Sequence, residues 1–454
     1  MSSNLDLIVI GGGSAGLGAA NAGNREGKKV LLINEGEPGG DCTFWGCVPS
    51  KALISQSRKG ASFDEAMNHV RSAVARIGAA ETFSVLESHG MRTADGRASF
   101  VSNNTVEVDG TRFTAPRIVI ATGSRAFVPP IPGLDTVDFL TNKEIFSLPR
   151  KPESLAVLGG GPIGVELAQA MAKLGVAVTI FEMADRILLR EEPEASVAIT
   201  QALEADGITL RLGAAVTGVA PVPTGGIRVE TGDSSDTFDQ LLVATGRKPN
   251  SEGLELERAG VKMTDRGYIE TSDKLETTGD GVYAAGDVTG KLPFTHAADE
   301  MGRLATAHAL GLLQKWKFKE HWIPWATFTD PEVARVGLTE AEAASKGGRV
   351  AYLPMSEFDR AITDGATNGF VKIIAGPKPI TRRVAGGEVI GATIVTPRAG
   401  EMINEIALAM RTKMFTGRLG QSTHAYPTWG FAIPQTVAQF FFEQNGRTAQ
   451  PAKG

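Results

Sequence analysis

A strand, a glycine-rich turn, a helix and a second strand follow one another twice in this chain of 454 residues, and this repeat constrains the fold most. The first copy starts at residue 5 and reads LDLIVIGGGSAGLGAANAGNREGKKVLLINE. We expect strands at 7–10 and 30–33 in it, and a helix that opens after Gly16. The second copy starts at residue 154 and reads SLAVLGGGPIGVELAQAMAKLGVAVTIFE. Such an internal repeat predicts two βαβ units in an α/β fold.

Both turns have the glycine spacing of a dinucleotide-binding loop. The pattern G-x-G-x-x-G occurs at Gly11, Gly13 and Gly16 and again at Gly159, Gly161 and Gly164. The first glycine permits the tight turn, the second lets the backbone approach a pyrophosphate, and the third lets helix and strand pack closely. The phosphate then lies at the N-terminus of the helix. Two such loops indicate electron transfer between two dinucleotides, and a flavin and a nicotinamide are the obvious pair.

An acidic residue at the end of the second strand normally binds the ribose hydroxyls of the dinucleotide. In the second copy Glu182 lies 23 residues after the first glycine of its loop. The same offset in the first copy leads to Asn34, with Glu35 next to it, so this ribose contact is open between the two residues. Because Glu182 would repel a 2′-phosphate, we expect NADH as the electron donor. Arg186 follows nearby and leaves NADPH as a second donor.

Three further strands end in glycine-containing turns. The segments IVIATGSRAFVPPIPG (118–133) and LLVATGRKPN (241–250) each contain a strand that ends in Ala-Thr-Gly, and TTGDGVYAAGDVTG (277–290) contains one that ends in Gly286-Asp287. A carboxylate at a strand end can accept hydrogen bonds from a polyol such as the ribityl chain of a flavin. The alternative interpretation of Asp287 is an ordinary turn aspartate.

The only two cysteines of the chain lie five positions apart in GGDCTFWGCVPSK (39–51). Disulfides are rare in a reducing compartment unless they are catalytic or redox-sensing, and two cysteines alone do not complete a zinc site. Residues five apart on an ideal helix have Cα atoms about 8.6 Å apart, beyond the roughly 4.4–6.8 Å of a disulfide. The segment is therefore distorted or begins its helix only near Cys47, and Pro49 supports this because proline fits a first helical turn. The positive end of that helix favours the thiolate form of Cys47.

Composition and charge exclude several classes of protein. Hydrophobic residues make up 42 % of the chain and charged residues 21 %, which is typical of a globular protein with real cores. The net charge is -5 without a basic tract, so we expect no nucleic-acid partner. The opening MSSNLDLIVIGGG has an apolar run of about five residues, too short for a signal peptide or a membrane span. We expect no membrane association and a cytoplasmic location.

The pattern changes from about residue 331 onward. FVKIIAG and GEVIGATIV predict sheet strands, and EMINEIALAMRTKMF predicts a helix. We expect a separate α+β domain here, followed by a disordered tail, NGRTAQPAKG.

In these motifs the sequence resembles the flavoprotein disulfide reductases, which include dihydrolipoamide dehydrogenase, glutathione reductase and mercuric reductase. Their redox signature, G-G-x-C-x-x-x-x-C-x-P-[ST]-K, matches GGDCTFWGCVPSK, and FTDPEVARVGLTEAEA (328–343) also matches. The resemblance covers nearly the whole chain. It implies an α/β fold with two Rossmann-like dinucleotide-binding domains, for FAD and NAD(P), and a C-terminal α+β dimerisation domain. The implied domains are 1–150 (FAD, first part), 151–275 (NAD(P)), 276–330 (FAD, second part) and 331–454 (dimer interface).

The resemblance also implies roles for individual residues. Cys47 is the flavin-side sulfur that forms the charge-transfer thiolate, and Cys42 is the outer sulfur that attacks the substrate. Lys51 lies at the flavin N5 edge and pairs with Glu166, on the helix after the second glycine loop. Asp287 holds the ribityl chain.

The cofactor contacts that the loops and the resemblance imply fall into two sets. FAD contacts are implied for Gly11, Gly13, Ser14, Ala15, Gly16, Asn34, Glu35, Gly40, Asp41, Lys51, Ala121, Thr122, Gly123, Gly286, Asp287 and Ala297. NAD contacts are implied for Gly159, Gly161, Ile163, Gly164, Glu182, Ala244, Thr245 and Gly246. No residue is predicted to be a metal ligand.

The sequence departs from the family near its C-terminus. Disulfide reductases carry His-Pro-Thr-x-x-Glu there, and the His reaches across a homodimer to act as acid and base for the outer thiol. This chain reads HAYPTWGFAIPQ (424–435), with Tyr426 in place of the His and Phe431 in place of the Glu. Tyrosine is a poor base at neutral pH. His424 lies two residues early, and whether it substitutes for the base is open.

Three interpretations follow. The first is a reductase that passes electrons from NADH through FAD to the Cys42–Cys47 disulfide and on to a small-molecule acceptor that the sequence does not identify. The second is a dihydrolipoamide dehydrogenase that serves a lipoyl partner. The third is a non-catalytic flavin- or nucleotide-binding protein, against which the intact cysteine pair and the Lys51–Glu166 pair argue. Mercuric reductases share the tyrosine, yet they add a cysteine pair in the tail that is absent here.

Overall fold

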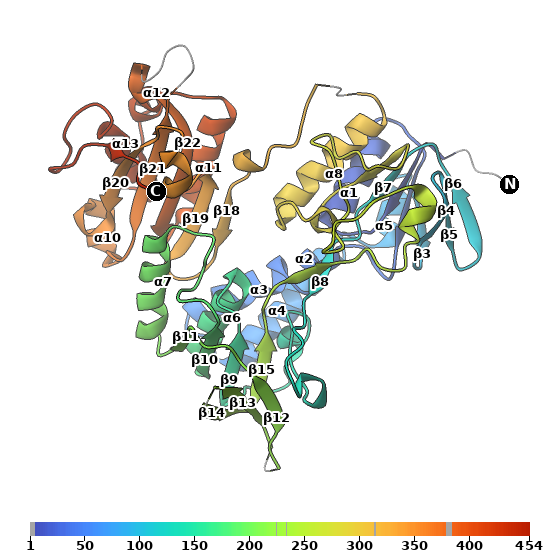
Figure 1. The fold of residues 1–454 in the computed structure, drawn as a ribbon, viewed down its shortest axis with the longest axis horizontal. Helices are drawn as coiled ribbons and strands as arrows, with labels where there is room; N and C mark the ends of the chain where they lie inside the picture. Colours follow the sequence, from blue (N-terminus) through green and yellow to red (C-terminus); the bar gives the residue numbers. More distant parts are fainter. Residues whose placement is uncertain (1–4, 224, 233, 313–314, 378–383) are drawn as a thin grey trace. The chain divides into compact units, whose positions relative to one another are not determined.

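The computed structural model of the chain describes residues 5–223, 225–232, 234–312, 315–377 and 384–454. They form two compact units, whose secondary structure is shown in Figure 1. The first unit comprises residues up to 129, 140–151 and 245–319, and the second comprises 130–139, 152–244 and 320–454. Each unit thus contains one of the two glycine loops. The domain boundaries at 150, 275 and 330 stay a prediction.

A parallel five-stranded sheet forms the centre of the first unit, in the order β17-β7-β1-β2-β3. Its strands are β1 (Leu7–Ile10), β2 (Val30–Asn34), β3 (Arg92–Asp95), β7 (Ile118–Ile120) and β17 (Val282–Ala284). All side chains of β1 and β7 are buried, as expected for parallel strands covered on both faces. Helices α1 (Ser14–Arg25) and α8 (Thr295–Ala309) pack closely together, and a Cβ on Gly302 would lie 2.0 Å from the carbonyl oxygen of Ala15.

Helix α1 begins earlier than the sequence predicted. It starts at Ser14, with Gly13 as its N-cap, so Gly16 lies inside the helix rather than before it. The N–H of Leu17 donates to the carbonyl of Gly13 at 2.8 Å, which closes the first turn. Gly16 allows the helix to pack closely on the loop. A glycine required for packing does not indicate where the helix begins.

The remaining elements of the first unit are four helices and two small antiparallel sheets. The helices are α2 (Gly40–Phe44), α3 (Cys47–Arg58), α4 (Phe63–Gly78) and α5 (Phe83–Ser88). The strands are β4 (Ser99–Ser102), β5 (Thr105–Val108) and β6 (Thr111–Thr114) in one antiparallel sheet, and β8 (Ser124–Ala126) with β16 (Arg247–Pro249) in another. Helix α4 starts at a capping box of Ser62 and Glu65, which satisfies N–H groups of its first turn.

The second unit begins with a parallel four-stranded sheet in the order β11-β10-β9-β15. Its strands are β9 (Ser154–Leu158), β10 (Ala177–Glu182), β11 (Thr209–Leu212) and β15 (Gln240–Val243), joined by α6 (Pro162–Lys173) and α7 (Pro193–Ala205). Proline lies in the first turn of both helices, where its missing N–H costs nothing. An antiparallel sheet of β12 (Gly218–Pro221), β13 (Ile227–Thr231) and β14 (Ser234–Phe238) follows.

The C-terminal part of the second unit is built on a six-stranded antiparallel sheet with helices, in the order β18-β19-β22-β21-β20-β23. Its strands are β18 (Trp325–Thr327), β19 (Glu332–Gly337), β20 (Arg349–Pro354), β21 (Phe370–Gly376), β22 (Glu388–Thr396) and β23 (Gln450–Pro451). Its helices are α9 (Glu340–Ala344), α10 (Asp359–Asp364), α11 (Ala399–Arg411), α12 (Thr416–Gln421) and α13 (Ala432–Ala438). The two strands expected in this part, FVKIIAG and GEVIGATIV, are confirmed as β21 and β22.

Two expectations for this part were wrong. The tail is ordered, because β23 pairs with β20 and the side chain of Arg447 forms an ion pair with Glu357 at 2.6 Å. The polar composition of the tail gave no indication of this strand pairing or this ion pair. The predicted helix at 401–415 ends at Arg411, because Lys413 has a φ of +53° and the chain then turns back, with the N–H of Met414 bonded to the carbonyl of Ala409.

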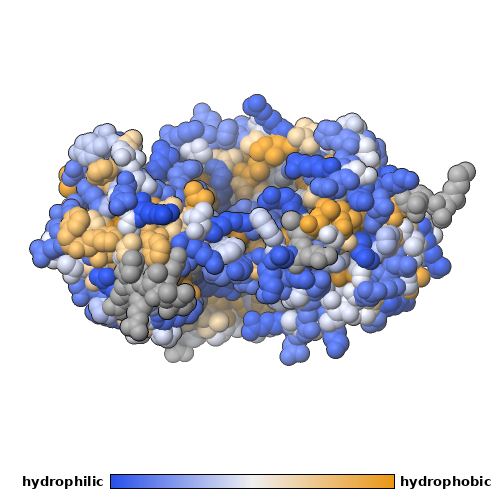
Figure 2. Space-filling view, turned by 90° about the horizontal axis from the view of Figure 1, so that it is seen from above, coloured by the Kyte–Doolittle hydropathy of each residue, from blue (hydrophilic) through white to orange (hydrophobic). Residues whose placement is uncertain are grey.

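Large apolar side chains are exposed in the C-terminal part, and Leu408 and Phe442 are 60 % and 58 % accessible. Hydrophobic colouring spreads over part of this end of the chain, at the left of Figure 2. Exposed apolar surface of this kind marks interaction sites in soluble proteins. Among the described residues, the helices are all too short or too polar to span a bilayer.

A buried lysine ties the C-terminal sheet to the N-terminal ends of α7 and α9. Lys372 on β21 is 1 % accessible, and its Nζ lies 2.7 Å from Glu194, 2.9 Å from Glu340 and 3.5 Å from Glu192. Burial opposes the charge, but the hydrogen bonds to Glu194 and Glu340 outweigh it and raise the pKa of Lys372. The ammonium group is therefore the charged centre that three carboxylates share.

Replacing Lys372 with methionine is expected to destabilise the protein by about 3–5 kcal/mol, because it leaves a buried carboxylate without its cation. Urea denaturation measures the change. Lys248→Met is the matched control, since it removes a lysine whose ion pair with Glu252 is exposed to solvent. Equal changes in the free energy of unfolding would show that the buried ion pairs of Lys372 stabilise the protein no more than the exposed pair of Lys248.

Candidate active site

The first glycine loop has the shape that a pyrophosphate requires. Gly11 has a φ of +106°, and a Cβ there would lie 2.3 Å from the carbonyl oxygen of Ala121. A Cβ on Gly16 would lie 1.7 Å from the carbonyl oxygen of Gly11, so helix and loop touch. Around Gly13 the space is open, with the Cα of Gly40 the nearest atom at 3.9 Å. The open space at the N-terminus of α1 fits the phosphates of FAD.

The structure gives Asn34 and Glu35 different environments, which bears on which of them contacts the ribose. The Oδ1 of Asn34 accepts the N–H of Gly12 at 2.7 Å, and its Nδ2 donates to the carbonyl of Gly36 at 2.9 Å. The Asn34 amide therefore holds the glycine loop and its own turn. Glu35 is exposed beside it. This favours Glu35 for the ribose contact, which stays a prediction.

An ionic network surrounds the end of β17. The Oδ2 of Asp287 accepts a hydrogen bond from Ser124 at 2.6 Å and lies 3.6 Å from Nε of Arg247. Nη2 of Arg247 contacts Asp41 at 2.8 Å, and Nδ2 of Asn142 donates to Asp41 at 3.1 Å. Burial raises the pKa of Asp287, and the bond from Ser124 works against that rise. Sequence reasoning missed Arg247, whose only signal was its place directly after the second Ala-Thr-Gly.

Other predicted FAD contacts lie at strand ends or helix starts of the same unit. Gly40 has a φ of +63° and its missing Cβ would lie 2.7 Å from the Cα of Gly13. Ser14 and Ala15 form the first turn of α1, and Ala297 is buried in the first turn of α8. The Ala121-Thr122-Gly123 turn follows β7, where the Oγ1 of Thr122 donates to the carbonyl of Asn250, and Gly286 precedes Asp287.

The two cysteines lie on separate helices, as the spacing argument required. Cys42 belongs to the short α2, and Cys47 is the first residue of α3, with Pro49 in its first turn. Both cysteines are free thiols in the structure. Hydrogen bonding with Cys47, together with burial, raises the pKa of Cys42. This favours Cys47, at the positive end of α3, as the thiolate of the pair, which stays a prediction.

Thr295 is a contact of the redox pair that the sequence did not reveal. Its Oγ1 lies 3.1 Å from Sγ of Cys47, although 248 positions separate the two residues. Its carbonyl accepts a hydrogen bond from the hydroxyl of Ser14 at 2.9 Å, which ties the start of α8 to the first glycine loop. The only signal in the sequence was the helix start at Thr295-His296.

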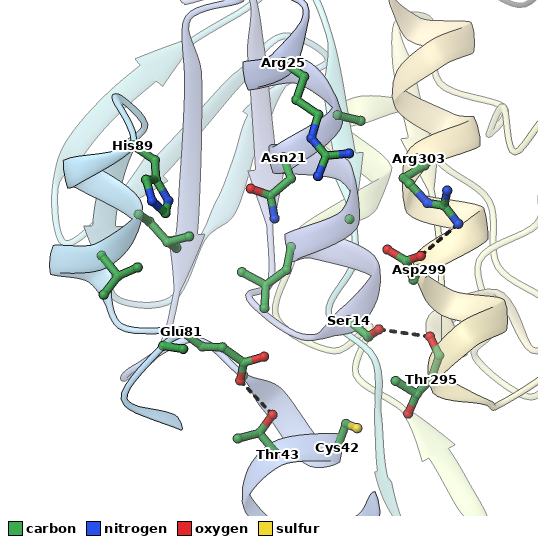
Figure 3. Close-up of a pocket in the computed structure, with 17 residues that line it drawn as sticks. Ser14, Asn21, Arg25, Cys42, Thr43, Glu81, His89, Thr295, Asp299 and Arg303 are labelled. Carbon is green, nitrogen blue, oxygen red and sulfur yellow. Dashed lines mark hydrogen bonds and ion pairs between the residues drawn. The ribbon is translucent and has the colours of Figure 1, made fainter. Parts of the chain in front are cut away.

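A cavity of about 550 Å³ opens beside Cys42 (Figure 3). Its lining comes from α1, α2, α5, α8 and the turn before α5, and includes Ser14, Cys42, Glu81, His89 and Thr295. The carboxylate of Glu81 accepts a hydrogen bond from the hydroxyl of Thr43 at 2.7 Å. A small molecule in this cavity would lie next to Cys42. Among the described residues, no group of three metal-ligating side chains occurs.

The second glycine loop repeats the first within the second unit. Gly159 has a φ of +110°, and a Cβ on Gly164 would lie 2.0 Å from its carbonyl oxygen. No atom lies within 4 Å of the position that a Cβ on Gly161 would occupy, so a pyrophosphate has room at the start of α6. Ile163 is exposed in that first turn. Ala244 follows β15 with its N–H bonded to the carbonyl of Leu158, next to the loop.

Glu182 ends β10, where the sequence placed it. Its Oε2 accepts the N–H of Gly160 at 2.7 Å and its Oε1 the N–H of Ala184 at 2.9 Å. Each carboxylate oxygen keeps a second lone pair for a ribose hydroxyl. Arg186 is held elsewhere, because its guanidinium donates to Ser196 at 2.7 Å and to the carbonyl of Leu189 at 2.8 Å.

The structure locates several further predicted site residues but does not test the contacts predicted for them. Lys51 lies in the second turn of α3, in the first unit. Glu166 is buried on α6, in the second unit, and its Oε1 accepts the N–H of Phe328 at 2.8 Å. The Lys51–Glu166 pair stays a prediction. Thr245 and Gly246 belong to the first unit, where the hydroxyl of Thr245 donates to the carbonyl of Phe127.

Tyr426 and Phe431 lie together in the second unit. Their ring centroids are 5.4 Å apart in an edge-to-face contact. The hydroxyl of Tyr426 donates to Oδ2 of Asp359 at 3.0 Å, and this bond raises the pKa of Tyr426. The phenol therefore stays protonated at neutral pH and is no base. Asp359, at the start of α10, was not visible as its partner in the sequence.

His424 has a carboxylate partner that the sequence did not show. Its Nε2 lies 2.9 Å from Oε2 and 3.0 Å from Oε1 of Glu405 on α11, and its Nδ1 lies 2.8 Å from the carbonyl oxygen of Ser422. Both ring nitrogens thus face acceptors. The imidazole is held by Glu405 and by the backbone of Ser422. Whether His424 substitutes for the missing base stays open.

Comparison with known protein families matches the chain to two family models. Residues 5–302 match the pyridine nucleotide-disulphide oxidoreductase family, and residues 323–447 match the pyridine nucleotide-disulphide oxidoreductase dimerisation domain. Together the two matches span both glycine loops, the cysteine pair and the C-terminal sheet except for β23.

Individual relatives agree. A mercuric reductase of Bacillus cereus is 34 % identical over 457 residues, covering 96 % of this chain and 71 % of that protein. A dihydrolipoyl dehydrogenase of Thermus scotoductus is 32 % identical over 459 residues, 93 % of this chain and 94 % of that protein. The Cu(II) complex of the HOCl-induced flavoprotein disulfide reductase RclA from Escherichia coli superposes with a TM-score of 0.88 at 28 % identity, covering 96 % and 99 % of the two chains. The chain therefore belongs to the pyridine nucleotide-disulphide oxidoreductase family and is an FAD-dependent oxidoreductase.

Proposed function

We propose that the chain takes electrons from NADH and passes them through FAD to Cys42 and Cys47, and then to an acceptor that needs no protein base. FAD, when bound, supplies the hydride chemistry that links a nicotinamide to a disulfide. The chain's own residues hold the phosphates at the two glycine loops and present one cysteine on α2 and the other at the start of α3. The dimerisation-domain match supports a homodimer. The four-part domain division predicted from the sequence is part of this proposal.

The C-terminal motif is the observation that carries this proposal. An acid–base pair is needed to deprotonate the attacking thiol and to protonate the leaving thiolate when an organic disulfide is reduced. Tyr426 is hydrogen-bonded to Asp359 as a protonated phenol, and Phe431 has no ionisable group. His424 faces acceptors on both sides. An acceptor such as a soft metal ion, a quinone or an activated sulfur oxidant avoids this proton transfer.

A dihydrolipoamide dehydrogenase is the second candidate. Proteins of that name are among the relatives, and one is 32 % identical over 459 residues, which cover 93 % of this chain. The lost His–Glu pair argues against it, because oxidation of dihydrolipoamide requires removal of a thiol proton. Rapid NADH formation from dihydrolipoamide and NAD⁺ would favour this function over the first.

NADH is expected to be used at least about 10²-fold more efficiently than NADPH, because Glu182 would face the 2′-phosphate as a like charge. Arg186 cannot relieve this repulsion without giving up its bonds to Ser196 and Leu189. The measurement is kcat/KM for both donors. Arg186→Ala is the control and should leave the preference for NADH in place. A higher kcat/KM for NADPH in the wild type would refute this role of Glu182.

A turnover screen tests the proposed function. Purified protein is supplied with NADH and, in separate assays, with lipoamide, glutathione disulfide, a quinone, Hg(II) and reactive chlorine or thiocyanate oxidants. We expect poor activity with the two disulfides, lipoamide and glutathione disulfide, and activity with at least one of the other acceptors. Efficient turnover of lipoamide or glutathione disulfide would contradict the proposal.

A further inference from the structure

The helix that carries Cys42 is too short to hold its own position. Helix α2 has five residues, and a hydrogen bond from the N–H of Trp45 to the carbonyl of Asp41 at 2.9 Å closes it. Isolated helices shorter than about 12–15 residues are marginal in water. The position of Cys42 must therefore be fixed by contacts between α2 and other elements.

One buried amide holds both ends of α2. The Nδ2 of Asn142 donates to Oδ1 of Asp41 at 3.1 Å and to the carbonyl of Trp45 at 3.0 Å. Both partners are acceptors only, so the amide nitrogen must face them. Asn142 is 7 % accessible, and the ammonium of its neighbour Lys143 lies 4.7 Å from the centre of the Trp45 ring. Asn142 thus fastens the helix at its first turn and at its last.

Arg247 holds the second carboxylate oxygen of Asp41. Its Nη2 lies 2.8 Å from Oδ2 of Asp41, so each oxygen of this carboxylate has a donor from outside α2. The guanidinium is itself fixed, because Nε donates to Oγ of Ser124 at 2.7 Å and Nη2 donates to the carbonyl of Ser124 at 2.9 Å. Ser124 and Arg247 belong to the paired strands β8 and β16. This strand pair therefore anchors α2 within the first unit.

The two thiols depend on different anchors. Cys47 begins α3, and its Sγ lies 3.1 Å from Oγ1 of Thr295 on α8. Cys42 depends on the contacts of α2. A disulfide requires Cβ atoms about 3.5–4.5 Å apart, and a movement of α2 against α3 changes this distance. Holding two reacting groups in place raises their effective concentration, so the contacts of α2 govern how readily the two sulfurs join.

We propose that Asn142 and Arg247 are positioning residues of the redox pair, which hold Cys42 against Cys47 and thereby favour the disulfide over the dithiol. They act through the ends of α2 and not through a sulfur atom. This inference rests on the proposed function, because it takes the two cysteines as a pair that alternates between dithiol and disulfide. When the disulfide forms, the two thiols lose two protons and two electrons, and one sulfur–sulfur bond is made.

The thiol–disulfide equilibrium of the pair provides the test. FAD-loaded protein is equilibrated anaerobically with mixtures of reduced and oxidised dithiothreitol, quenched with acid and alkylated, and its free thiols are counted by mass spectrometry. Each protein disulfide that opens takes two electrons and two protons from one dithiothreitol, which closes to its cyclic disulfide. The count concerns only the cysteines, so it depends neither on turnover nor on the state of the flavin.

Asn142→Ala is expected to shift this equilibrium toward the dithiol by at least about tenfold, which corresponds to a rise of about 30 mV in the potential of the pair. It leaves no buried charge without a partner. Arg247→Lys should shift the equilibrium in the same direction, because a single ammonium cannot replace the planar guanidinium between Asp41 and Ser124.

Two control variants remove side-chain hydrogen bonds of the same kind elsewhere in the first unit. Asn24 donates to the carbonyl of His89 at 2.9 Å, and Arg117 donates to the carbonyl of Ala309 at 3.0 Å. Asn24→Ala and Arg117→Lys should therefore leave the equilibrium where it is. A shift in these controls as large as that in Asn142→Ala would overturn the inference.

The absorption of the fully reduced protein gives a second readout. Cys47 is held by α3 and Thr295, so Asn142→Ala and Arg247→Lys should keep the thiolate–flavin charge-transfer absorption of the wild type. Loss of this absorption in both variants would show that they disturb the whole site and not the position of α2, which would also overturn the inference.

The outcomes separate the inference from the proposed function. An unchanged equilibrium in either variant, or a shift toward the disulfide, overturns the role of the residue that was replaced, even if the wild type passes electrons through the pair. A wild type whose thiol count is the same at every dithiothreitol ratio contradicts the redox pair, and with it both the proposed function and this inference. A shift toward the dithiol in both variants, with the charge-transfer absorption kept, supports both.

Discussion

Cys42→Ser is expected to lower NADH-driven acceptor reduction by at least about 10³-fold, the scale seen when a catalytic nucleophile is removed. Cys42 borders the cavity, and its thiol shares a hydrogen bond with Cys47. A serine hydroxyl can neither form the sulfur–sulfur bond nor bind a soft acceptor. The measurement is turnover with the acceptor found in the screen, at saturating NADH.

Cys47→Ser is the companion variant, and its expected spectrum differs. With Cys47 present and Cys42 replaced, a thiolate remains at the start of α3 and the thiolate–flavin charge-transfer absorption should persist. With Cys47 replaced, this absorption should vanish together with turnover. A Cys47→Ser protein that keeps the long-wavelength absorption would reverse the assigned roles of the two sulfurs, and a fully active Cys42→Ser protein would exclude the dithiol from the route.

Replacing Tyr426 with histidine and Phe431 with glutamate together is expected to raise kcat/KM for lipoamide and glutathione disulfide by about 10²–10⁴-fold, the usual contribution of general acid–base catalysis. The two rings are in edge-to-face contact, with centroids 5.4 Å apart, so a His and a Glu in their places would be neighbours. Such a pair supplies the base that the wild type lacks.

The single variant Tyr426→His, without the carboxylate, should give a smaller gain, and Tyr426→Phe should give none. A wild-type kcat/KM near 10⁶ M⁻¹s⁻¹ for either disulfide, which lies inside the ordinary enzyme range of about 10⁴–10⁸, would contradict this account. It would mean that another group already transfers the proton.

Local chemistry made much of the fold predictable from the sequence. The glycine spacings fixed both loops because each position has a separate steric reason, as the 2.3 Å and 2.0 Å approaches at Gly11 and Gly164 show. Pro49 correctly placed the start of α3 at Cys47 because proline suits a first helical turn. These inferences needed only neighbours in the chain.

The parts that the sequence did not reveal depend on contacts between distant segments. Thr295 contacts Cys47 across 248 positions, and Glu405 on α11 contacts His424 in the loop after α12. Asp359 binds the hydroxyl of Tyr426 across 67 positions. No local sequence pattern predicts such contacts, because they form only when separate elements pack together. The tail shows the same limit, since its strand exists only through pairing with β20.

The most direct test of the electron route is an anaerobic titration of the FAD-loaded wild type with NADH, in which thiols are counted before and after reduction. The account predicts one FAD per chain and two new thiols per chain, with long-wavelength charge-transfer absorption appearing as the Cys42–Cys47 disulfide opens. Two electrons from NADH that bleach the flavin without releasing any thiol would contradict it, because they would not have passed through the cysteine pair.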